Sequence, residues 1–114
     1  MTGKNGALER IRKAVMTWEG VESQPHRFGG VEFRYGKREI GHIHGDFLVD
    51  IPFPIKERNE LIESRRAEPH HILPSSGWVS CYIKNEDDIN TAIELLELSL
   101  RLARIIKTDS TAGH

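Results

Sequence analysis

Residues 42–52 read His-Ile-His-Gly-Asp-Phe-Leu-Val-Asp-Ile-Pro, which is two short apolar segments divided by Gly45-Asp46. Glycine in the first position of a two-residue turn is typical of a type II′ β-hairpin. The stretch therefore predicts two antiparallel strands, with His42 and His44 on the same side of the first strand. A titratable side chain buried in a sheet costs free energy unless it has a partner, so these histidines are either structurally satisfied or functional.

A second glycine-first turn, Gly36-Lys37, joins this hairpin to an alternating strand at residues 31–35. Directly opposed residues share a face of a sheet, and counting from the two turns places Val31 opposite His42 and His42 opposite Val49. The face predicted to lie under helices consists of Val31, Phe33, Tyr35, Ile40, His42, His44, Phe47, Val49 and Ile51. The opposite face is predicted to carry Glu32, Arg34, Glu39, Gly41, Ile43, Leu48 and Asp50. A slip of one residue at either turn would exchange the two faces.

Helical periodicity and turn signals predict the elements around this meander. They are a helix over 7–18, an edge strand over 21–24, a short helix over 55–64, a connection over 65–77, a strand over 78–83 and a helix over about 85–107. Asn85 is the expected N-cap of the last helix. Both sides of the strand 78–83 carry residues suited to a core, so its inward side stays open. The pattern predicts an α+β fold: an antiparallel sheet meander with the N-terminal helix, the short middle helix and the long C-terminal helix packed on one face.

The composition is that of one domain, residues 1–114, with an ordered part at about 7–107 and frayed ends at 1–6 and 108–114. The formal net charge of −1 provides no global field for nucleic acid, which is therefore not an expected partner. The single cysteine, Cys81, excludes an internal disulfide and fits a reducing compartment. We find no signal peptide and no apolar run long enough for a membrane span, so we expect a cytoplasmic protein without a membrane partner.

The last helix carries two apolar stripes, so its apolar surface is wide. One stripe consists of Ile89, Ile93, Leu96, Leu100 and Ala103, and the other of Leu95, Leu98, Leu102 and Ile105. One stripe should cover the sheet, and the other must meet the first helix or a second subunit. If the second stripe is uncovered within the monomer, we expect a homodimer through the C-terminal helix.

The candidate ligand-binding residues are His42, His44, His70 and Trp78. Two histidines that alternate on one strand project their side chains about 7 Å apart, which suits two ligands to one metal ion or an acid–base pair near a ligand. His26 and His71 could complete such a site. The alternative is a structural role, with His42 held by a backbone carbonyl. No Cys-x-x-Cys or His-Glu-x-x-His spacing occurs, so the sequence predicts no metal site, and it assigns neither a cofactor nor a catalytic residue.

Several motifs in order carry a resemblance to a known family. They are the segments at residues 26–33, 41–46, 50–54, 67–71 and 76–79, with His42-Ile43-His44-Gly45-Asp46 and Ala67-Glu68-Pro69-His70-His71 among them. Together they resemble the small bacterial and fungal "luciferase domain" proteins over about residues 18–103. The family description implies an oxidation that emits light. The order of elements and Trp78 are also similar, more loosely, to the YjbR/MmcQ-like α+β fold, whose members have been suggested to bind DNA.

Three functions are compatible with these observations. The first is a binding module with a histidine- and tryptophan-lined groove for a small-molecule ligand. The second is an enzyme in which a histidine does acid–base work, with an oxidation as the reaction that the family description implies. The third is a nucleic-acid-binding accessory protein of the YjbR/MmcQ-like type. The sequence leaves open whether any reaction is catalysed.

Overall fold

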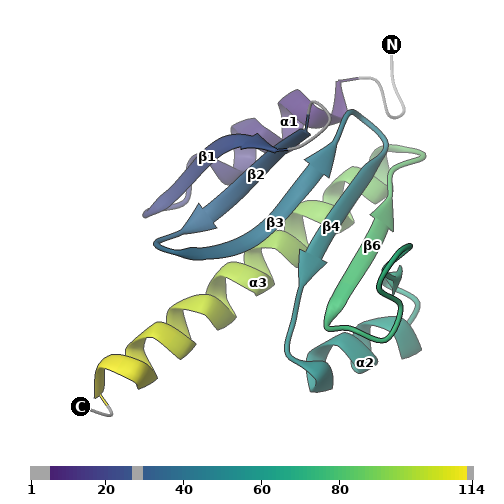
Figure 1. Cartoon of the computed structure of the whole chain (residues 1–114). Helices are drawn as coiled ribbons and strands as arrows, with labels where there is room; N and C mark the ends of the chain where they lie inside the picture. The colour runs from purple at the N-terminus through teal and green to yellow at the C-terminus, as the bar shows by residue number, and fades with distance from the viewer. Residues whose placement is uncertain (1–5, 27–29, 113–114) are drawn as a thin grey trace.

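The described part of the computed structural model, residues 6–26 and 30–112, forms one antiparallel sheet flanked by helices (Figure 1). The strands are β1 (Val21–His26), β2 (Gly30–Tyr35), β3 (Arg38–His44), β4 (Leu48–Pro52), β5 (Glu68–Pro69) and β6 (Trp78–Tyr82). Their order across the sheet is β1-β2-β3-β4-β6-β5, and each neighbouring pair is antiparallel. The helices are α1 (Ala7–Val15), α2 (Ile55–Glu63) and α3 (Glu86–Ala112). The predicted α+β fold class is confirmed.

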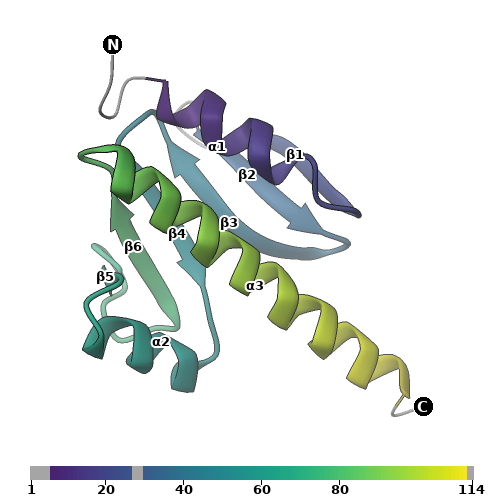
Figure 2. The same ribbon diagram turned by 180° about the vertical axis from the view of Figure 1, so that it is seen from behind.

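Helices α1 and α3 cover one face of the sheet, which we call the helix face (Figure 2). The apolar side of α1 buries Ile11 and Val15, while α3 buries Leu96 and Leu100 over the sheet. The other side of the sheet, which we call the open face, looks toward the viewer in Figure 1 and carries no helix across the central strands. The short helix α2 lies at the end of the sheet beside β5 and β6.

The predicted N-cap of α3 is confirmed, since the backbone N–H of Asp88 donates to the Asn85 side chain at 3.0 Å. The helix continues to Ala112, past the predicted end near residue 107, and its C-terminal part projects beyond the sheet (Figure 2). In the second stripe Leu95 is buried, Leu98 and Leu102 pack against the core, and Ile105 is 51% exposed. Among the described residues, no helix is both long and apolar enough to cross a membrane. Of the ends predicted to fray, residues 1–5 and 113–114 lie outside the described residues, whereas residues 108–112 belong to α3, so the prediction is wrong for them.

The predicted register of β2 and β3 is correct only next to the turn. Arg34 pairs with Glu39 as expected, but the register then shifts by one residue. The shift is a β-bulge at Ile40, an extra residue on β3 that is buried in the core. The predicted pair of Val31 with His42 is therefore wrong, because Val31 pairs with Ile43 and His42 falls on the other face.

The second hairpin is also one residue out of the predicted register. Its turn contains three residues, so His44 pairs with Leu48, and His42 pairs with Asp50. The predicted opposition of His42 and Val49 is wrong for this reason, because Val49 pairs with Ile43 on the helix face. As a result, His42 and His44 share the open face with Asp50.

The inward side of β6, which the sequence left open, is defined by its pairing with β4. Val79 and Cys81 pair with buried residues of the helix face, so Trp78 and Ser80 belong to the open face. The two-residue strand β5, which the predicted connection over 65–77 did not include, pairs with β6. This pairing carries the residues that follow β5, at positions 70 and 71, to the sheet beside β6.

Candidate functional site

Asp50 lies at the centre of a group of histidines on the open face. Its side chain is fully buried, and its Oδ1 accepts a hydrogen bond from Ser80 Oγ at 2.8 Å. Its Oδ2 lies 3.2 Å from His42 Nε2, 3.1 Å from His44 Nε2, 3.4 Å from His70 Nε2 and 3.2 Å from His71 Nε2. We call Asp50 and these four residues the histidine–aspartate cluster.

Three separate segments build this cluster. The alternation of β3 places His42 and His44 on one face, and the antiparallel pairing with β4 sets Asp50 directly opposite His42. The segment that follows β5 supplies the other two histidines. Ser80 reaches Asp50 because the two residues are paired across β4 and β6. Backbone pairing within the sheet therefore holds each segment that contributes a residue to the cluster.

The crowding at Asp50 Oδ2 exceeds what hydrogen bonding alone requires. A carboxylate oxygen offers about two lone-pair sites, yet four imidazole nitrogens surround this one. Around a transition metal with bonds of about 2.0–2.2 Å, neighbouring ligand atoms lie about 3.0–3.5 Å apart, and these contacts fall in that range. Two groups of ligand atoms, each mutually within 4.8 Å, share Asp50: one with His42 and His44, the other with His70 and His71. The arrangement is suited to enclosing a cation.

The charges of the cluster are unevenly distributed. Burial alone would raise the pKa of the Asp50 carboxyl, but hydrogen bonds from His42, Ser80 and His71 hold this pKa well below its usual range. Burial would lower the pKa of His42, yet the Asp50 and Glu39 carboxylates outweigh it and raise that pKa to about 9. Burial lowers the pKa of His44 and His70. At neutral pH an anionic carboxylate thus faces one charged and two neutral imidazoles.

A second layer of side chains fixes the ring of His42. Glu39 Oε2 lies 2.6 Å from its Nδ1, and the ring of His26 stacks on it with centroids 4.0 Å apart. Trp78 packs on the same ring at a centroid distance of 5.3 Å. A carboxylate on the outer nitrogen is the usual partner of a metal-binding histidine, because it fixes the tautomer and the orientation of the ring.

The structure brings together all four residues named from the sequence. His42 and His44 contact Asp50, and so does His70, while Trp78 lies 6.1 Å from the His70 ring. The predicted register placed His42 and His44 under the helices, and this is wrong. The histidines lie on the open face, where they are shielded by one another and by Trp78. The predicted register placed Asp50 on the face opposite His42 and His44, so Asp50 was not among the candidate ligand-binding residues. Gly41 inside the strand was the available signal, since a strand glycine often marks a bulge.

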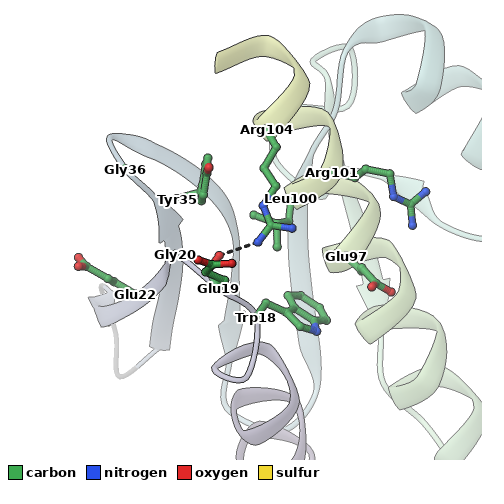
Figure 3. Close-up of a pocket in the computed structure, with 10 residues that line it drawn as sticks. All are labelled: Trp18, Glu19, Gly20, Glu22, Tyr35, Gly36, Glu97, Leu100, Arg101 and Arg104. Carbon is green, nitrogen blue, oxygen red and sulfur yellow. Dashed lines mark hydrogen bonds between the residues drawn. The ribbon is translucent and has the colours of Figure 1, made fainter. Parts of the chain in front are cut away.

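The structure contains a cavity, but the histidine–aspartate cluster does not line it. A cavity of about 790 Å³ lies between the residues that follow α1, the start of β1, the end of β2 and α3, and Figure 3 shows the residues that line it. Its lining includes Trp18, Tyr35, Leu100 and Arg104, and no histidine. Arg104 donates to the Glu19 carbonyl at 2.6 Å and lies over the Tyr35 ring. The ligand-binding prediction for the histidines therefore depends on direct coordination or hydrogen bonding and not on this cavity.

Glu32, which lies next to the cluster, is expected to affect the stability of the protein in acid. Burial alone would raise the pKa of the Glu32 carboxyl. Hydrogen bonds with His26, Gln24 and Arg34 outweigh burial and lower this pKa to about 2, against 4.5 for an ordinary glutamate. A lowered folded-state pKa stabilises the protein above pH 4.5, and this stabilisation is lost as the pH falls toward 2.

The variant Glu32→Gln is therefore expected to lower the free energy of unfolding at pH 7 by about 2 kcal/mol, allowing for solvent screening. It should also flatten the loss of stability between pH 5 and pH 2. Urea unfolding at several pH values measures both effects. Parallel wild-type and variant profiles would contradict the assignment.

A family model described as "Luciferase domain" matches residues 37–99, more than half of the 114 residues. Neither the curated proteins nor the solved structures provide a match to the chain. The similarity to the YjbR/MmcQ-like fold therefore stays a prediction. The matched segment contains every member of the histidine–aspartate cluster.

Proposed function

This chain belongs to the Luciferase domain family, as its sequence motifs predicted, and we propose that it is a binding module whose ligand is a divalent transition-metal ion. The supporting observation is the approach of four imidazole nitrogens to Asp50 Oδ2 at 3.1–3.4 Å. The proposal replaces the sequence-based expectation of no metal. That expectation rested on short spacing motifs, whereas the cluster is assembled from β3, β4 and the segment after β5.

The donor set restricts the kind of ion. Imidazole nitrogen with one carboxylate oxygen suits zinc, iron, cobalt, nickel or copper better than calcium or magnesium, which prefer oxygen ligands. Cys81 does not extend the set, because it lies on the helix face of β6 and burial raises the pKa of its thiol to about 12. The partial exposure of His44 and His71, with 23% and 32% of their side chains accessible, gives an ion a route from solvent.

An acid–base enzyme is the second candidate. The observation in its favour is the raised pKa of His42, which lies between the carboxylates of Asp50 and Glu39. Such an enzyme needs room for a substrate against His42. A reaction of the oxidative kind that the family description implies would in turn be compatible with a redox-active ion at the cluster. The nucleic-acid-binding alternative gains no support from a net charge of −1.

Metal binding is tested on protein freed of metal by a chelator and then titrated with Zn²⁺ and Co²⁺ by isothermal calorimetry. Saturating ion should raise Tm by about 10 °C, since a ligand at 100 times its Kd adds about 2.7 kcal/mol of stability. The variant His42→Ala/His44→Ala, checked for folding by circular dichroism, should lose this shift. Absence of binding by Zn²⁺, Co²⁺, Ni²⁺, Cu²⁺, Mn²⁺ and Fe²⁺ alike would reject the proposal.

The homodimer stays a prediction with a narrower basis. Most of the second stripe is covered within the chain, and among the side chains of α3 that the structure describes, up to residue 106, the large exposed apolar ones are Ile105 and Ile106, which are 51% and 38% exposed. A dimer through these residues should give twice the 13.0 kDa chain mass in light scattering at micromolar concentration. The variant Ile105→Glu should restore the monomer mass, and a wild-type monomer would reject the dimer. The cytoplasmic location likewise stays a prediction.

A further inference from the structure

We infer that the ligands in the proposed site are His42, His44, His71 and Asp50, whereas His70 is a positioning residue that orients the carboxylate. This inference rests on the proposed metal binding and assigns the roles within it. It separates two neighbouring histidines whose ring nitrogens both approach Asp50. Their roles differ because a different nitrogen of each ring is free to accept.

The Nδ1 atom of His70 is an acceptor of hydrogen bonds. The backbone N–H groups of Ile72 and Leu73 donate to it at 3.1 and 3.0 Å. A backbone N–H has no acceptor role, so this nitrogen carries no proton. In a neutral imidazole the single proton then resides on Nε2, which is the atom 3.4 Å from Asp50 Oδ2. His70 therefore presents an N–H to the carboxylate.

An N–H cannot bind a metal ion, because coordination needs the lone pair of an unprotonated nitrogen. For His70 to coordinate through Nε2, it would have to become an imidazolate or lose both backbone bonds at Nδ1. Those bonds hold the turn of the loop that follows β5. The contact from His70 to Oδ2 is also the longest of the four. At this distance its Nε2–H faces the carboxylate oxygen and offers no lone pair to an ion.

His42 shows the opposite arrangement. Its Nδ1 lies 2.6 Å from Glu39 Oε2, and a carboxylate accepts, so Nδ1 carries a proton. Loss of the second proton, from Nε2, leaves a lone pair aimed at the position beside Asp50 Oδ2. This is the tautomer that a carboxylate partner selects in metal-binding histidines. Hydrogen bonds at Nδ1 thus give His42 the tautomer of a metal ligand and His70 the tautomer of a hydrogen-bond donor.

His44 lies with His42 and Asp50 in one group of ligand atoms mutually within 4.8 Å, whereas the ring of the partly exposed His71 has to move toward that group when an ion binds in order to complete the ligand set. The Nε2 atoms of His44 and His71 lie 3.1 and 3.2 Å from Oδ2, as close as that of His42. Among the described residues, no backbone N–H donates to the Nδ1 of either ring. Both rings are partly exposed, so a proton can move to Nδ1 and free Nε2. Four protein ligands leave one or two positions for water or a small exogenous ligand on an ion that prefers five or six.

The test compares His70 and His71 variants with Co²⁺ as a spectroscopic probe. His71→Ala should reduce Co²⁺ affinity at least about 100-fold and change the visible absorption bands, because a ligand is lost. His70→Ala should reduce affinity about 10- to 100-fold with unchanged bands, as expected for an outer partner. His70→Gln, which restores an N–H donor toward Asp50, should recover much of that loss.

X-ray absorption of the wild-type Zn²⁺ or Co²⁺ complex counts the imidazoles and is expected to give three. Four imidazoles, or altered Co²⁺ bands in His70→Gln, would overturn the assignment even if the alanine variants fail to fold. Equal behaviour of the His70 and His71 variants would also overturn it. A wild-type protein that binds no ion would instead reject the proposed function itself, so the two failures are distinguishable.

Discussion

Replacing Asp50 by asparagine is expected to abolish tight metal binding and to destabilise the protein. Asparagine keeps the shape of the side chain but removes the anion that all four imidazole nitrogens approach. We expect a fall in Zn²⁺ affinity beyond the roughly 10- to 100-fold that loss of an outer partner causes. The metal-free protein should lose about 3 kcal/mol, since a buried charge pair has lost one member. Calorimetry and urea unfolding in chelator measure the two effects.

Two matched variants control this experiment. Ser80→Ala removes only the hydrogen bond to Asp50 Oδ1 and should cost about 1 kcal/mol, with a smaller loss of affinity. Asp87→Asn removes an exposed carboxylate from the first turn of α3 and should leave metal binding unchanged. Retention of wild-type Zn²⁺ affinity by Asp50→Asn would show that the carboxylate is not a ligand.

The architecture could be predicted from the sequence because its signals are local. The periodicity of α1 and α3, the Asn85 cap and the alternation of β2 each depend on a few neighbouring residues, and these elements are confirmed, although α1 ends at Val15 and not at the predicted residue 18. Two elements depended on longer-range information. The strand β5 has only two residues and exists through its pairing with β6. The C-terminal turns of α3 lie beyond the sheet, where packing does not fix their length.

The predicted register was wrong because an error of one residue at a turn or a bulge shifts every strand pair beyond it. The bulge at Ile40 and the third residue of the turn before Leu48 each shift the pairing by one. Because side chains alternate on a strand, each shift exchanges the faces. The predicted proximity of His42 and His44 survived, since both lie on one strand. The contact of these histidines with Asp50 was not predicted, because predicting it requires the correct pairing of two strands.

Gly41 connects the bulge with the cluster. Its φ of +154° lies outside the range that residues with a Cβ favour, and it directly precedes His42. The pairing of Gly41 with Phe33 lets the chain pass close under Leu96 of α3. A bulge increases the local twist and re-aims the next side chain. The sheet thereby directs His42 toward Asp50 while Ile40 and Ile43 stay in the core.

The variant Gly41→Ala is accordingly expected to lower the free energy of unfolding by about 2–4 kcal/mol. An added Cβ would lie 2.4 Å from Leu96 Cδ2 and 3.1 Å from the Asp50 carbonyl oxygen, and the φ would be strained as well. Relief of these contacts must move α3 or the β4 backbone that carries Asp50. Zn²⁺ affinity should therefore fall about 10-fold in the protein that remains folded. Urea unfolding and calorimetry on the same preparation measure both.

Gly6→Ala separates backbone strain from crowding, because Gly6 has a φ of +77° and its added Cβ would meet nothing within 4 Å. It should cost about 1 kcal/mol and leave metal binding unchanged. Combining Gly41→Ala with Leu96→Ala removes the closest contact, so the double variant should lose less stability than the sum of the two single losses. Additive losses would mean that the contact with α3 is not the cause. An unchanged Zn²⁺ affinity in Gly41→Ala would mean that the bulge does not hold His42 and Asp50 in position.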